Sequence, residues 1–462
     1  MKFDDILEKL ESDGEILNYR FHKSQIPMYL VIRFSLIQSL INKEFDLSNP
    51  HVQNSNRTIK ENLTYIYHTL KSNLFFAPKK DIYIFSSDIL NILDGDKYKN
   101  RLHNDLYNLY IDKSQIFEIS TNYTYKEPKY NKVYFIDLIP ILREFLSIFF
   151  RKIKQDILEI EELIFFINKR IGLDENQVQN LERILRRFSL TVDIECFFYK
   201  LFIKIKKPKV LILDCAHYGV YIPLILAAKK FNIKIVEYQH GYIGLAHPAY
   251  NYHKNIFQTI KKYLPEYFLT HGKYWSNVAR TPSKKIPIGL ASLSKNIDKI
   301  SKVEKQGKSI LFISGGTVYK TLNALIKKSL INLQELGYTV LLRPHPSEFP
   351  AIQERYSSLI DMGVQIDAAS LYSTLKEADI VIGMEVSTVL YEAICFTNKV
   401  YLMDTIYTTF YEPKSYFLLF KNEKELLDSI KEKRTLNYEA SFFWDNNWEK
   451  NYKNFIKRIK KS

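Results

Sequence analysis

Charged, histidine, amide and hydroxyl residues follow most of the apolar runs in the second half of the sequence. They are Asp214, His217, Glu237, Gln239, His240, His271, Arg343, His345, Glu385, Ser387 and Thr388. Such runs are typical of parallel strands buried on both faces, and the carboxyl ends of parallel strands meet at one edge of a sheet. We therefore expect these side chains to converge, in combinations suited to proton transfer and anion binding. For any single histidine, a hydrogen-bonded structural role is the alternative.

The segment 383–393 (GMEVSTVLYEA) carries the clearest anion signal, because it follows an apolar run and opens a predicted helix. Ser387 is a suitable N-cap and Thr388 falls in the first turn. The N–H groups and dipole at such a helix start can hold a phosphate. Glu392, four residues beyond Thr388, shares its helix face and could reach a ribose hydroxyl. A capped helix without a ligand is the alternative.

Two further strand ends fit the same anion site. Arg343 and His345 end one strand, and the prolines on either side of His345 restrict its backbone. A guanidinium and an imidazole beside Ser387 would form a phosphate clamp to which Glu385 also belongs. The loop Ser314, Gly315, Gly316 and Thr317 ends another strand, where adjacent glycines allow a ligand to approach the backbone. A simple turn is the alternative for this loop.

The elements that must position these residues alternate between strand and helix. Strands are predicted at 81–86, 132–137, 210–214, 233–238, 266–270, 285–289, 309–314, 338–346, 378–383 and 399–404, and helices at 219–231, 321–336, 370–377 and 387–395. This alternation indicates an α/β fold of two Rossmann-like, doubly wound lobes that face a central cleft, with extra N-terminal helices. We expect a first lobe over 1–295 with a helical insertion near 150–205, a charged linker over 296–308, a second lobe over 309–435, and a basic helix over 436–462 that packs on the first lobe.

Composition narrows the class of protein. The chain has 462 residues, 46% of them hydrophobic and 25% charged, which is typical of a globular protein and excludes disorder and fibrous repeats. Three scattered cysteines favour a reducing cytoplasm and exclude a disulfide framework. Neither a secretory signal nor a membrane span is predicted. The net charge of +15 favours an anionic partner: nucleic acid, anionic lipid or a phosphorylated small molecule.

Metal chemistry is not indicated. The acidic pair Asp94 and Asp96 sits in a turn-forming context, and the histidine spacings contain no ligand pair suited to zinc. No P-loop, GxGxxG, GxSxG or HExxH motif occurs. We therefore expect a metal-independent protein without a cofactor.

The basic tail, 448–462 (WEKNYKNFIKRIKKS), places aromatic and apolar residues on one side of a predicted helix. One interpretation is an interfacial helix that holds the protein at the anionic inner face of the inner membrane. The alternative is a terminal helix that packs on the first lobe.

Six segments in this order resemble bacterial surface-polysaccharide glycosyltransferases of the GT-B type. They are EYQHG (237–241), HPAYNY (247–252), LTHGKYW (269–275), IPIG (286–289), RPHPSE (343–348) and EVSTVLYEA (385–393). The chain is most similar to capsule and lipopolysaccharide transferases that use CMP-activated Kdo or sialic-acid-like nonulosonates, and CDP-glycerol phosphotransferases share an RPHP-like element. The segment LDGDKYKN (93–100) resembles a further family element.

The resemblance implies that His345, Ser387 and Thr388 bind the donor phosphate. For catalysis we favour Asp214 as base or nucleophile, because it follows a buried strand of the acceptor lobe. His240 and Glu237 compete for that role, and His240 could instead stabilise the leaving phosphate or the donor carboxylate. His217, Gln239 and His271 are expected on the acceptor side.

We therefore expect a cytoplasmic glycosyltransferase that moves a CMP-linked sugar to a lipid-linked or glycan acceptor in a growing capsule or O-antigen. A CDP-alditol phosphotransferase and a sugar-nucleotide 2-epimerase are the enzymatic alternatives. A basic nucleic-acid-binding protein ranks last, because the aromatic residues follow buried periods more than basic stripes.

Overall fold

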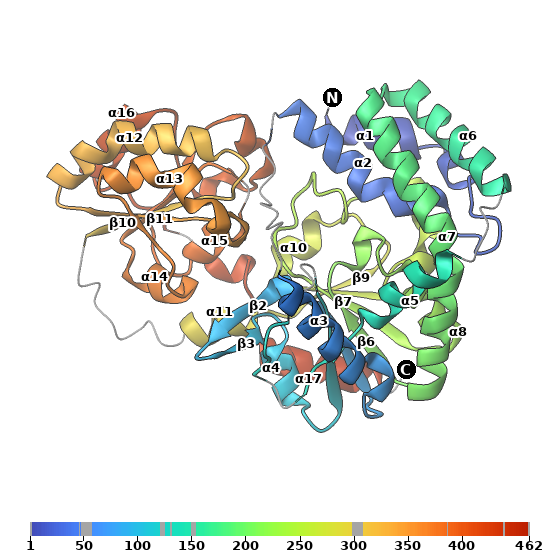
Figure 1. The fold of residues 1–462 in the computed structure, drawn as a ribbon. Coiled ribbons are helices and arrows are strands. Elements are labelled where there is room, and N and C mark those ends of the chain that lie inside the picture. The colour runs from blue at the N-terminus through green and yellow to red at the C-terminus, as the bar shows by residue number, and fades with distance from the viewer. Residues whose placement is uncertain are drawn as a thin grey trace. The chain divides into compact units, whose positions relative to one another are not determined.

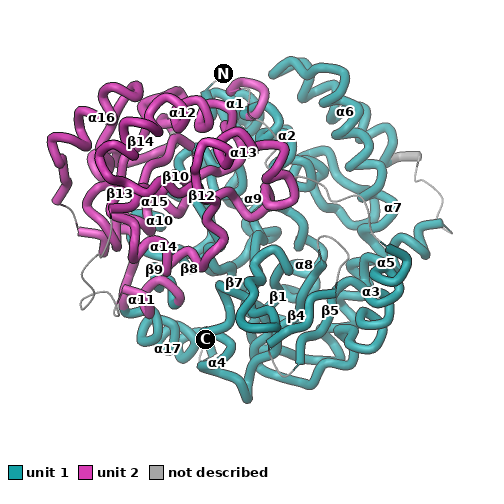
Figure 2. Tube along the Cα trace, turned by 60° about the vertical axis from the view of Figure 1, so that its left-hand side comes forward, with its two compact units in different colours: residues 1–41, 57–291, 447–462 teal, residues 42–56, 292–446 magenta. Residues whose placement is uncertain are grey.

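The computed structural model describes residues 2–45, 47, 58–120, 125–129, 132–148, 154–297, 308–385, 387–437 and 439–460. The chain forms two compact units (Figure 2). Unit 1 comprises Met1–Ile41, Arg57–Ala291 and Asn447–Ser462, and unit 2 comprises Asn42–Asn56 and Ser292–Asn446. Of the linker expected over 296–308, residues 298–307 lie outside the described part of the chain.

Unit 1 is built on a seven-stranded, all-parallel sheet of order β5-β4-β1-β6-β7-β8-β9 (Figure 1). The strands are β1 (Ile82–Ser87), β4 (Ser114–Ile119), β5 (Tyr134–Phe135), β6 (Val210–Leu213), β7 (Lys234–Tyr238), β8 (Tyr267–Thr270) and β9 (Lys284–Pro287), and a separate hairpin pairs β2 (Asn91–Asp94) with β3 (Lys97–Asn100). In chain order the sheet reads 3-2-1-4-5-6-7. This is the Rossmann order with one strand added, and its switch point lies between β1 and β6.

One layer of helices in unit 1 packs on the sheet, and the two share a continuous hydrophobic core. The helices are α1 (Phe3–Glu11), α2 (Met28–Glu44), α3 (Ile59–Lys71), α4 (Asn104–Leu109), α5 (Leu138–Ser147), α6 (Lys154–Ile171), α7 (Glu175–Lys206), α8 (Ile222–Lys230), α9 (Phe257–Ile260), α10 (Lys273–Val278) and α17 (Trp448–Ile459). In that core Phe85 and Leu213 from the sheet pack with Ile139 of α5, Phe202 of α7 and Leu224 of α8. Alternate strand residues reach this layer because side chains alternate across a strand.

Unit 2 is built on a six-stranded, all-parallel sheet of order β12-β11-β10-β13-β14-β15. Its strands are β10 (Ser309–Ile313), β11 (Thr339–Arg343), β12 (Gln365–Ile366), β13 (Ile380–Gly383), β14 (Val400–Met403) and β15 (Leu418–Phe420). Its helices are α12 (Tyr319–Glu335), α13 (Ile352–Asp361), α14 (Leu371–Glu377), α15 (Thr388–Ala393) and α16 (Glu423–Lys431), and α11 (Ala291–Ile297) begins at the unit boundary. In chain order the strands read 3-2-1-4-5-6, which is the Rossmann order with its switch point between β10 and β13.

The fold class expected from the sequence is confirmed: each unit is a parallel α/β sheet of Rossmann-like order. The strands expected from continuous apolar runs are present, although 132–137 contributes only the two residues of β5. Strands β4, β12 and β15 and the hairpin β2–β3 were not expected. Strand β4 contains two polar residues, Gln115 and Glu118, whose side chains are buried. It therefore lacks a continuous apolar run.

The basic C-terminal helix α17 belongs to unit 1. Its apolar side is buried, and Tyr452 and Phe455 make edge-to-face contacts with Tyr110 and Tyr267, respectively. Lys460 pairs with Asp81 at 3.0 Å. The apolar side that would insert into a membrane is therefore occupied by packing.

None of the helices in the described ranges is long and apolar enough to cross a bilayer.

Candidate functional site

A buried carboxylate organises the switch point of unit 2. Glu385, just beyond β13, is 3% exposed and accepts hydrogen bonds from the backbone N–H groups that link β10 to α12. Oε1 accepts from Gly315 and from Gly316 (3.1 Å), and Oε2 accepts from Thr317 (2.9 Å) and Val318 (3.2 Å). The Thr317 hydroxyl also donates to Oε2. Burial raises the pKa of Glu385, and these hydrogen bonds oppose that rise.

The two glycines of this loop are required by its geometry. A Cβ on Gly315 would stand 2.8 Å from the Glu385 carboxyl carbon, which is too close for any other residue type to replace it without movement. Gly316 has φ +86°, a left-handed conformation that glycine adopts readily. In the structure, the anion that contacts this backbone is the chain's own Glu385 carboxylate, and the expected approach of a ligand stays a prediction.

A second buried carboxylate connects this loop to His345. Glu348 is fully buried, and its Oε2 accepts from the His345 backbone N–H at 2.8 Å. Its Oε1 accepts from Arg355 (2.8 Å) and from the Tyr356 hydroxyl (2.6 Å), which lies 3.0 Å from the Ser314 hydroxyl. The ends of β10 and β11 are thus joined through one carboxylate.

The His345 ring is held in a defined tautomer. Its Nδ1 accepts a hydrogen bond from the Ser347 backbone N–H at 3.2 Å and lies 2.6 Å from the Ser347 hydroxyl. Because Nδ1 acts as an acceptor, the neutral ring carries its proton on Nε2. A half-buried imidazole with an Nε2–H donor is suited to contact a phosphate oxygen.

Arg343 is engaged within unit 2. Its guanidinium forms an ion pair with Asp367 and donates to the Ala369 carbonyl at 3.1 Å. The charge expected to clamp a phosphate is thus shared with Asp367, and its phosphate role stays a prediction.

The start of α15 presents two hydroxyl residues. Ser387 caps the helix by accepting from the Val389 N–H at 3.2 Å, and its own N–H donates to the Tyr411 hydroxyl at 2.9 Å. Thr388 is half-buried, and no described group hydrogen-bonds its hydroxyl. Glu392, on α15, is only 4% exposed, so its carboxylate is less accessible to a ribose than expected.

At the switch point of unit 1, Asp214 is held by three polar neighbours. Its carboxylate is 2% exposed and is bonded by the Ser86 hydroxyl on Oδ2 and by His103 Nε2 on Oδ1. Asn100, at the end of the β2–β3 hairpin, donates to Ser86 Oγ at 2.7 Å and accepts from the His103 N–H at 2.9 Å. Sequence reasoning did not find these partners, although Asn100 closes the LDGDKYKN segment.

Glu237 is an equally enclosed carboxylate. It is fully buried, accepts from the Tyr250 hydroxyl at 2.7 Å on Oε1, and is bonded by His217 Nδ1 and its backbone N–H on Oε2. His217 Nε2 lies 3.0 Å from the Thr281 hydroxyl and 3.1 Å from that of Ser283. This arrangement is a closed hydrogen-bond network, so neither Glu237 nor His217 presents an open group.

His240 is the more accessible of the three residues proposed for catalysis. Its Nδ1 lies 3.2 Å from the Tyr250 hydroxyl, whose proton goes to Glu237, so Nδ1–H is the donor and Nε2 carries the lone pair. Nε2 lies 3.4 Å from the Tyr218 hydroxyl and 3.6 Å from Cys215 Sγ. Burial is the main cause that lowers the pKa of His240; the negative charges of Glu237 and Asp214 oppose this effect, and the positive charge of Arg101 adds to it.

The other expected acceptor-side residues are buried, and their contact with an acceptor stays a prediction. Gln239 is fully buried, accepts from the His271 backbone N–H at 2.8 Å and donates to the Gly241 carbonyl at 2.8 Å. Burial lowers the pKa of His271 to about 3. Arg101, which sequence reasoning missed, is exposed, and its charge also contributes to lowering this pKa. It is a cation at the carboxyl edge of the sheet.

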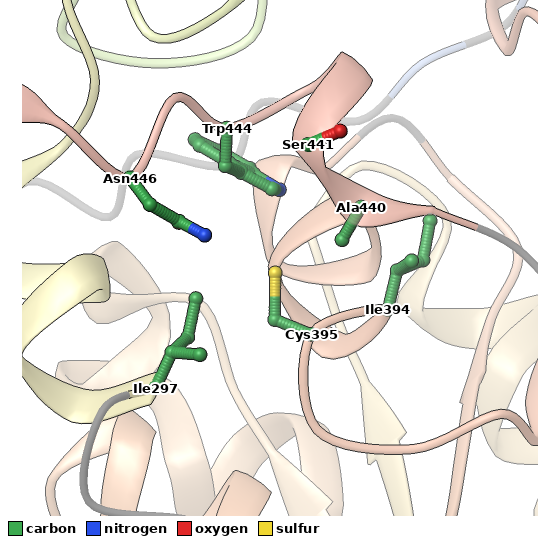
Figure 3. Close-up of a pocket in the computed structure, with 7 residues that line it drawn as sticks. All are labelled: Ile297, Ile394, Cys395, Ala440, Ser441, Trp444 and Asn446. Atoms are coloured by element: carbon green, nitrogen blue, oxygen red, sulfur yellow. The ribbon is translucent and has the colours of Figure 1, made fainter.

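Two cavities lie away from these residues. The pocket in Figure 3, of about 160 Å³, is lined by Ile297, Ile394, Cys395, Ala440, Ser441, Trp444 and Asn446. A second, of about 290 Å³ in unit 1, includes Asp94, Lys99 and Lys129. Both are smaller than the roughly 300–1,000 Å³ of small-molecule sites. Asp94 pairs with both lysines, and no group of three or more metal-binding side chains is found within the described ranges.

A further buried acid lies at the end of β4. Glu118 is 3% exposed and accepts from the Asn91 amide at 3.1 Å. Burial raises the pKa of Glu118 to about 7, and the negative charge of Asp88 adds to the rise. The sequence analysis did not find this acid, because β4 was not expected.

Comparison with known proteins gives structural likenesses alone, since no family model and no curated protein matches the chain. UDP-GlcNAc 2-epimerase from Methanocaldococcus jannaschii is 11% identical with a TM-score of 0.45, over 82% of this chain and 99% of that one. MurG from Acinetobacter baumannii is 11% identical with a TM-score of 0.40, over 83% and 100%. The lipopolysaccharide outer core galactosyltransferase WaaB is 13% identical with a TM-score of 0.41, over 82% and 99%.

The Glu385 carboxylate is expected to stabilise unit 2 measurably. Glu385→Gln replaces one acceptor oxygen with an NH₂ group and leaves at least two backbone N–H groups without an acceptor. We expect the free energy of unfolding to fall by roughly 1–3 kcal/mol in chemical denaturation. Glu354→Gln, at an exposed position of α13, should stay within about 0.5 kcal/mol of wild type. Equal stability of the two variants would show that the Glu385 contacts contribute nothing.

Glu118 should give a pH-dependent contribution of defined sign. Its folded pKa of about 7 lies above the ordinary value of 4.5, so the folded state binds more protons between these values. Stability from this group is present at low pH and falls by up to about 1.4 kcal/mol per pH unit as the pH rises through that window. Glu118→Gln keeps the Asn91 contact and cannot titrate. The wild-type free energy of unfolding, minus that of the variant, should therefore decrease from pH 4.5 to 7; a constant difference would contradict the burial effect.

Proposed function

We propose that the chain is a glycosyltransferase whose unit 2 binds a nucleotide-activated sugar. The observation that carries this proposal is the junction of three strand ends at the switch point of a Rossmann-order sheet. Glu385 joins the ends of β10 and β13, and Glu348, through the Tyr356 hydroxyl, connects the ends of β10 and β11. In open α/β sheets, ligands bind outside the carboxyl ends of the strands at this point.

The donor phosphate would be held by hydrogen-bond donors of unit 2. His345 offers an Nε2–H, and Thr388 offers a hydroxyl without a partner in the described structure. These contacts can stabilise the charge that develops on the leaving phosphate. The N–H groups of Gly315 and Thr317 are bonded to Glu385, so a phosphate would reach them only by displacing that carboxylate.

Unit 1 would supply the acceptor side. His240, with its lone pair on Nε2, is a suitable proton acceptor for a sugar hydroxyl. Asp214 remains a candidate base or nucleophile, and its bonds to Ser86 and His103 would first have to rearrange. Arg101 is a cation that could contact an acidic sugar.

The donor class is a proposal supported by the resemblance of the RPHPSE and EVSTVLYEA segments. We propose a CMP-linked Kdo or sialic-acid-like nonulosonate as donor and a growing capsule or O-antigen glycan as acceptor. Hydrogen-bond donors and one half-buried imidazole could carry the leaving phosphate without a metal ion.

Nucleotide binding tests the site directly. The full-length protein is screened by thermal shift against CMP, CDP, UDP and GDP. CMP should stabilise it, by about 2.7 kcal/mol at a ligand concentration of 100 Kd. Two variants locate the site: His345→Asn keeps an acceptor for the cap but lacks the imidazole, and Thr388→Val keeps the shape but lacks the hydroxyl. Both should lose most of the CMP shift while melting normally without nucleotide.

The matched control is His22→Ala, which removes an exposed histidine from unit 1. It should retain the full CMP shift. If His345→Asn and Thr388→Val respond to CMP like wild type, the assignment of the phosphate site is wrong. Product masses then separate the reactions: a phosphotransferase adds a phosphate to the acceptor, and an epimerase converts the donor without any acceptor.

A further inference from the structure

Helix α3 turns an apolar stripe away from the core of unit 1. Its exposed apolar residues are Ile59, Leu63, Ile66, Tyr67 and Leu70, and Ile59 is 80% exposed. At 3.6 residues per turn they occupy a stripe about 100° wide. The residues that α3 buries, Tyr65 and Thr69, lie on the opposite side. The usual orientation of an amphipathic surface helix, with its apolar side inward, is therefore reversed here.

Two neighbouring helices also expose apolar residues, although each of them buries apolar side chains in the core as well. On α5 and its C-cap, Ile141, Phe145 and Ile148 are exposed, and the buried Ile139 lies on the other side. On α7, Phe197, Leu201 and Ile205 are exposed, whereas Tyr199, Phe202 and Ile203 are in the core. Phe145 and Phe197 are 59% and 61% exposed, so they are not rim residues of the core.

The three stripes belong to one layer of unit 1. Ile139 of α5 and Phe202 of α7 share a hydrophobic core with Leu74, which follows α3. Arg143 of α5 pairs with Glu195 of α7, and the Phe135 N–H, just before α5, donates to the Ser72 carbonyl at the end of α3 at 2.8 Å. Both views show α3, α5 and α7 as neighbours (Figures 1 and 2). We refer to the exposed apolar residues of these three helices as the α3–α5–α7 surface.

At the C-terminal end of α7, the charged residues beside this surface are all positive. Residues 197–209 contain five lysines and no acidic residue. Lys200, Lys204 and Lys207 are exposed, and no ion pair of these three is found in the described structure. Lys60 and Lys71 lie on α3 beside its stripe. An apolar surface bordered by lysines is complementary to a partner that has an apolar interior and an anionic boundary.

We propose that the α3–α5–α7 surface docks on the boundary of an anionic lipid bilayer. Its apolar side chains would enter the region between headgroups and acyl chains, and the lysines would contact anionic headgroups. A second copy of the chain fits less well, because pairing this surface with itself would bring like charges together. The basic tail expected to make this contact is unsuited, since the apolar side of α17 is buried. The inference is independent of the reaction that the protein catalyses.

Vesicle co-sedimentation of the full-length protein tests the surface. One set of vesicles contains equal amounts of phosphatidylglycerol and phosphatidylcholine, and the other contains phosphatidylcholine alone. We expect binding to the first set at least tenfold stronger than to the second. The double variant Leu63→Glu, Phe197→Glu should lose at least tenfold in binding, and Lys200→Glu, Lys204→Glu should lose binding to anionic vesicles in a salt-dependent manner.

The matched control is Ile331→Glu, which places the same charge at a 64% exposed apolar position on α12 of unit 2. It should bind like wild type, and thermal melting confirms that each variant is folded. Unchanged binding of the double variant, or equal wild-type binding to both vesicle types, would overturn the proposal. So would a wild-type dimer that the double variant dissociates without any change in vesicle binding, because the surface would then join two copies.

Discussion

The geometry of unit 2 depends on the contact between the Glu385 carboxylate and the backbone N–H groups that precede α12. A buried carboxylate is costly unless it is hydrogen-bonded, and here four N–H groups and one hydroxyl bond it. The contact requires a glycine at 315, because a side chain there would meet the carboxylate. It also fixes the ends of β10 and β13 relative to each other at the point where the strand order reverses. Glu348 extends the same principle to His345, from whose backbone N–H it accepts a hydrogen bond at 2.8 Å.

Unit 1 follows the same principle with different residues. Asp214 and Glu237 are enclosed, and their oxygens are occupied by hydroxyl, imidazole and backbone donors. The Glu237–Tyr250–His240 series determines which imidazole nitrogen of His240 carries the proton. Glu237 thus orients the more accessible His240 ring through Tyr250, whereas the partners of Asp214 are themselves buried. The residue types at strand ends therefore indicate the location of a site better than they indicate the role of each residue in it.

The sequence predicted the two α/β units because most of their strands are continuous apolar runs, a pattern that buried parallel strands impose. It failed at β4, where Gln115 and Glu118 interrupt the run, and at the two- and three-residue strands β12 and β15. It located the strand ends that carry Asp214, His240, His345 and Glu385. It could not identify their partners, since Ser86 lies 128 residues from Asp214 and Gly315 lies 70 from Glu385. Only the sheet topology brings such residues together.

The amphipathic helices show a further limit of pattern reasoning. Periodicity reveals that a helix has an apolar side, but not whether that side faces the protein or its surroundings. In α17 the apolar side packs on Tyr110 and Tyr267, so a basic amphipathic tail proves to be a structural helix. In α3 the core takes Tyr65 and Thr69 instead, and the apolar stripe is left outside. Burying the α3 stripe inside the unit would have been favourable. The stripe is instead exposed, as are the apolar residues of α5 and α7, and this favours contact with an external apolar environment.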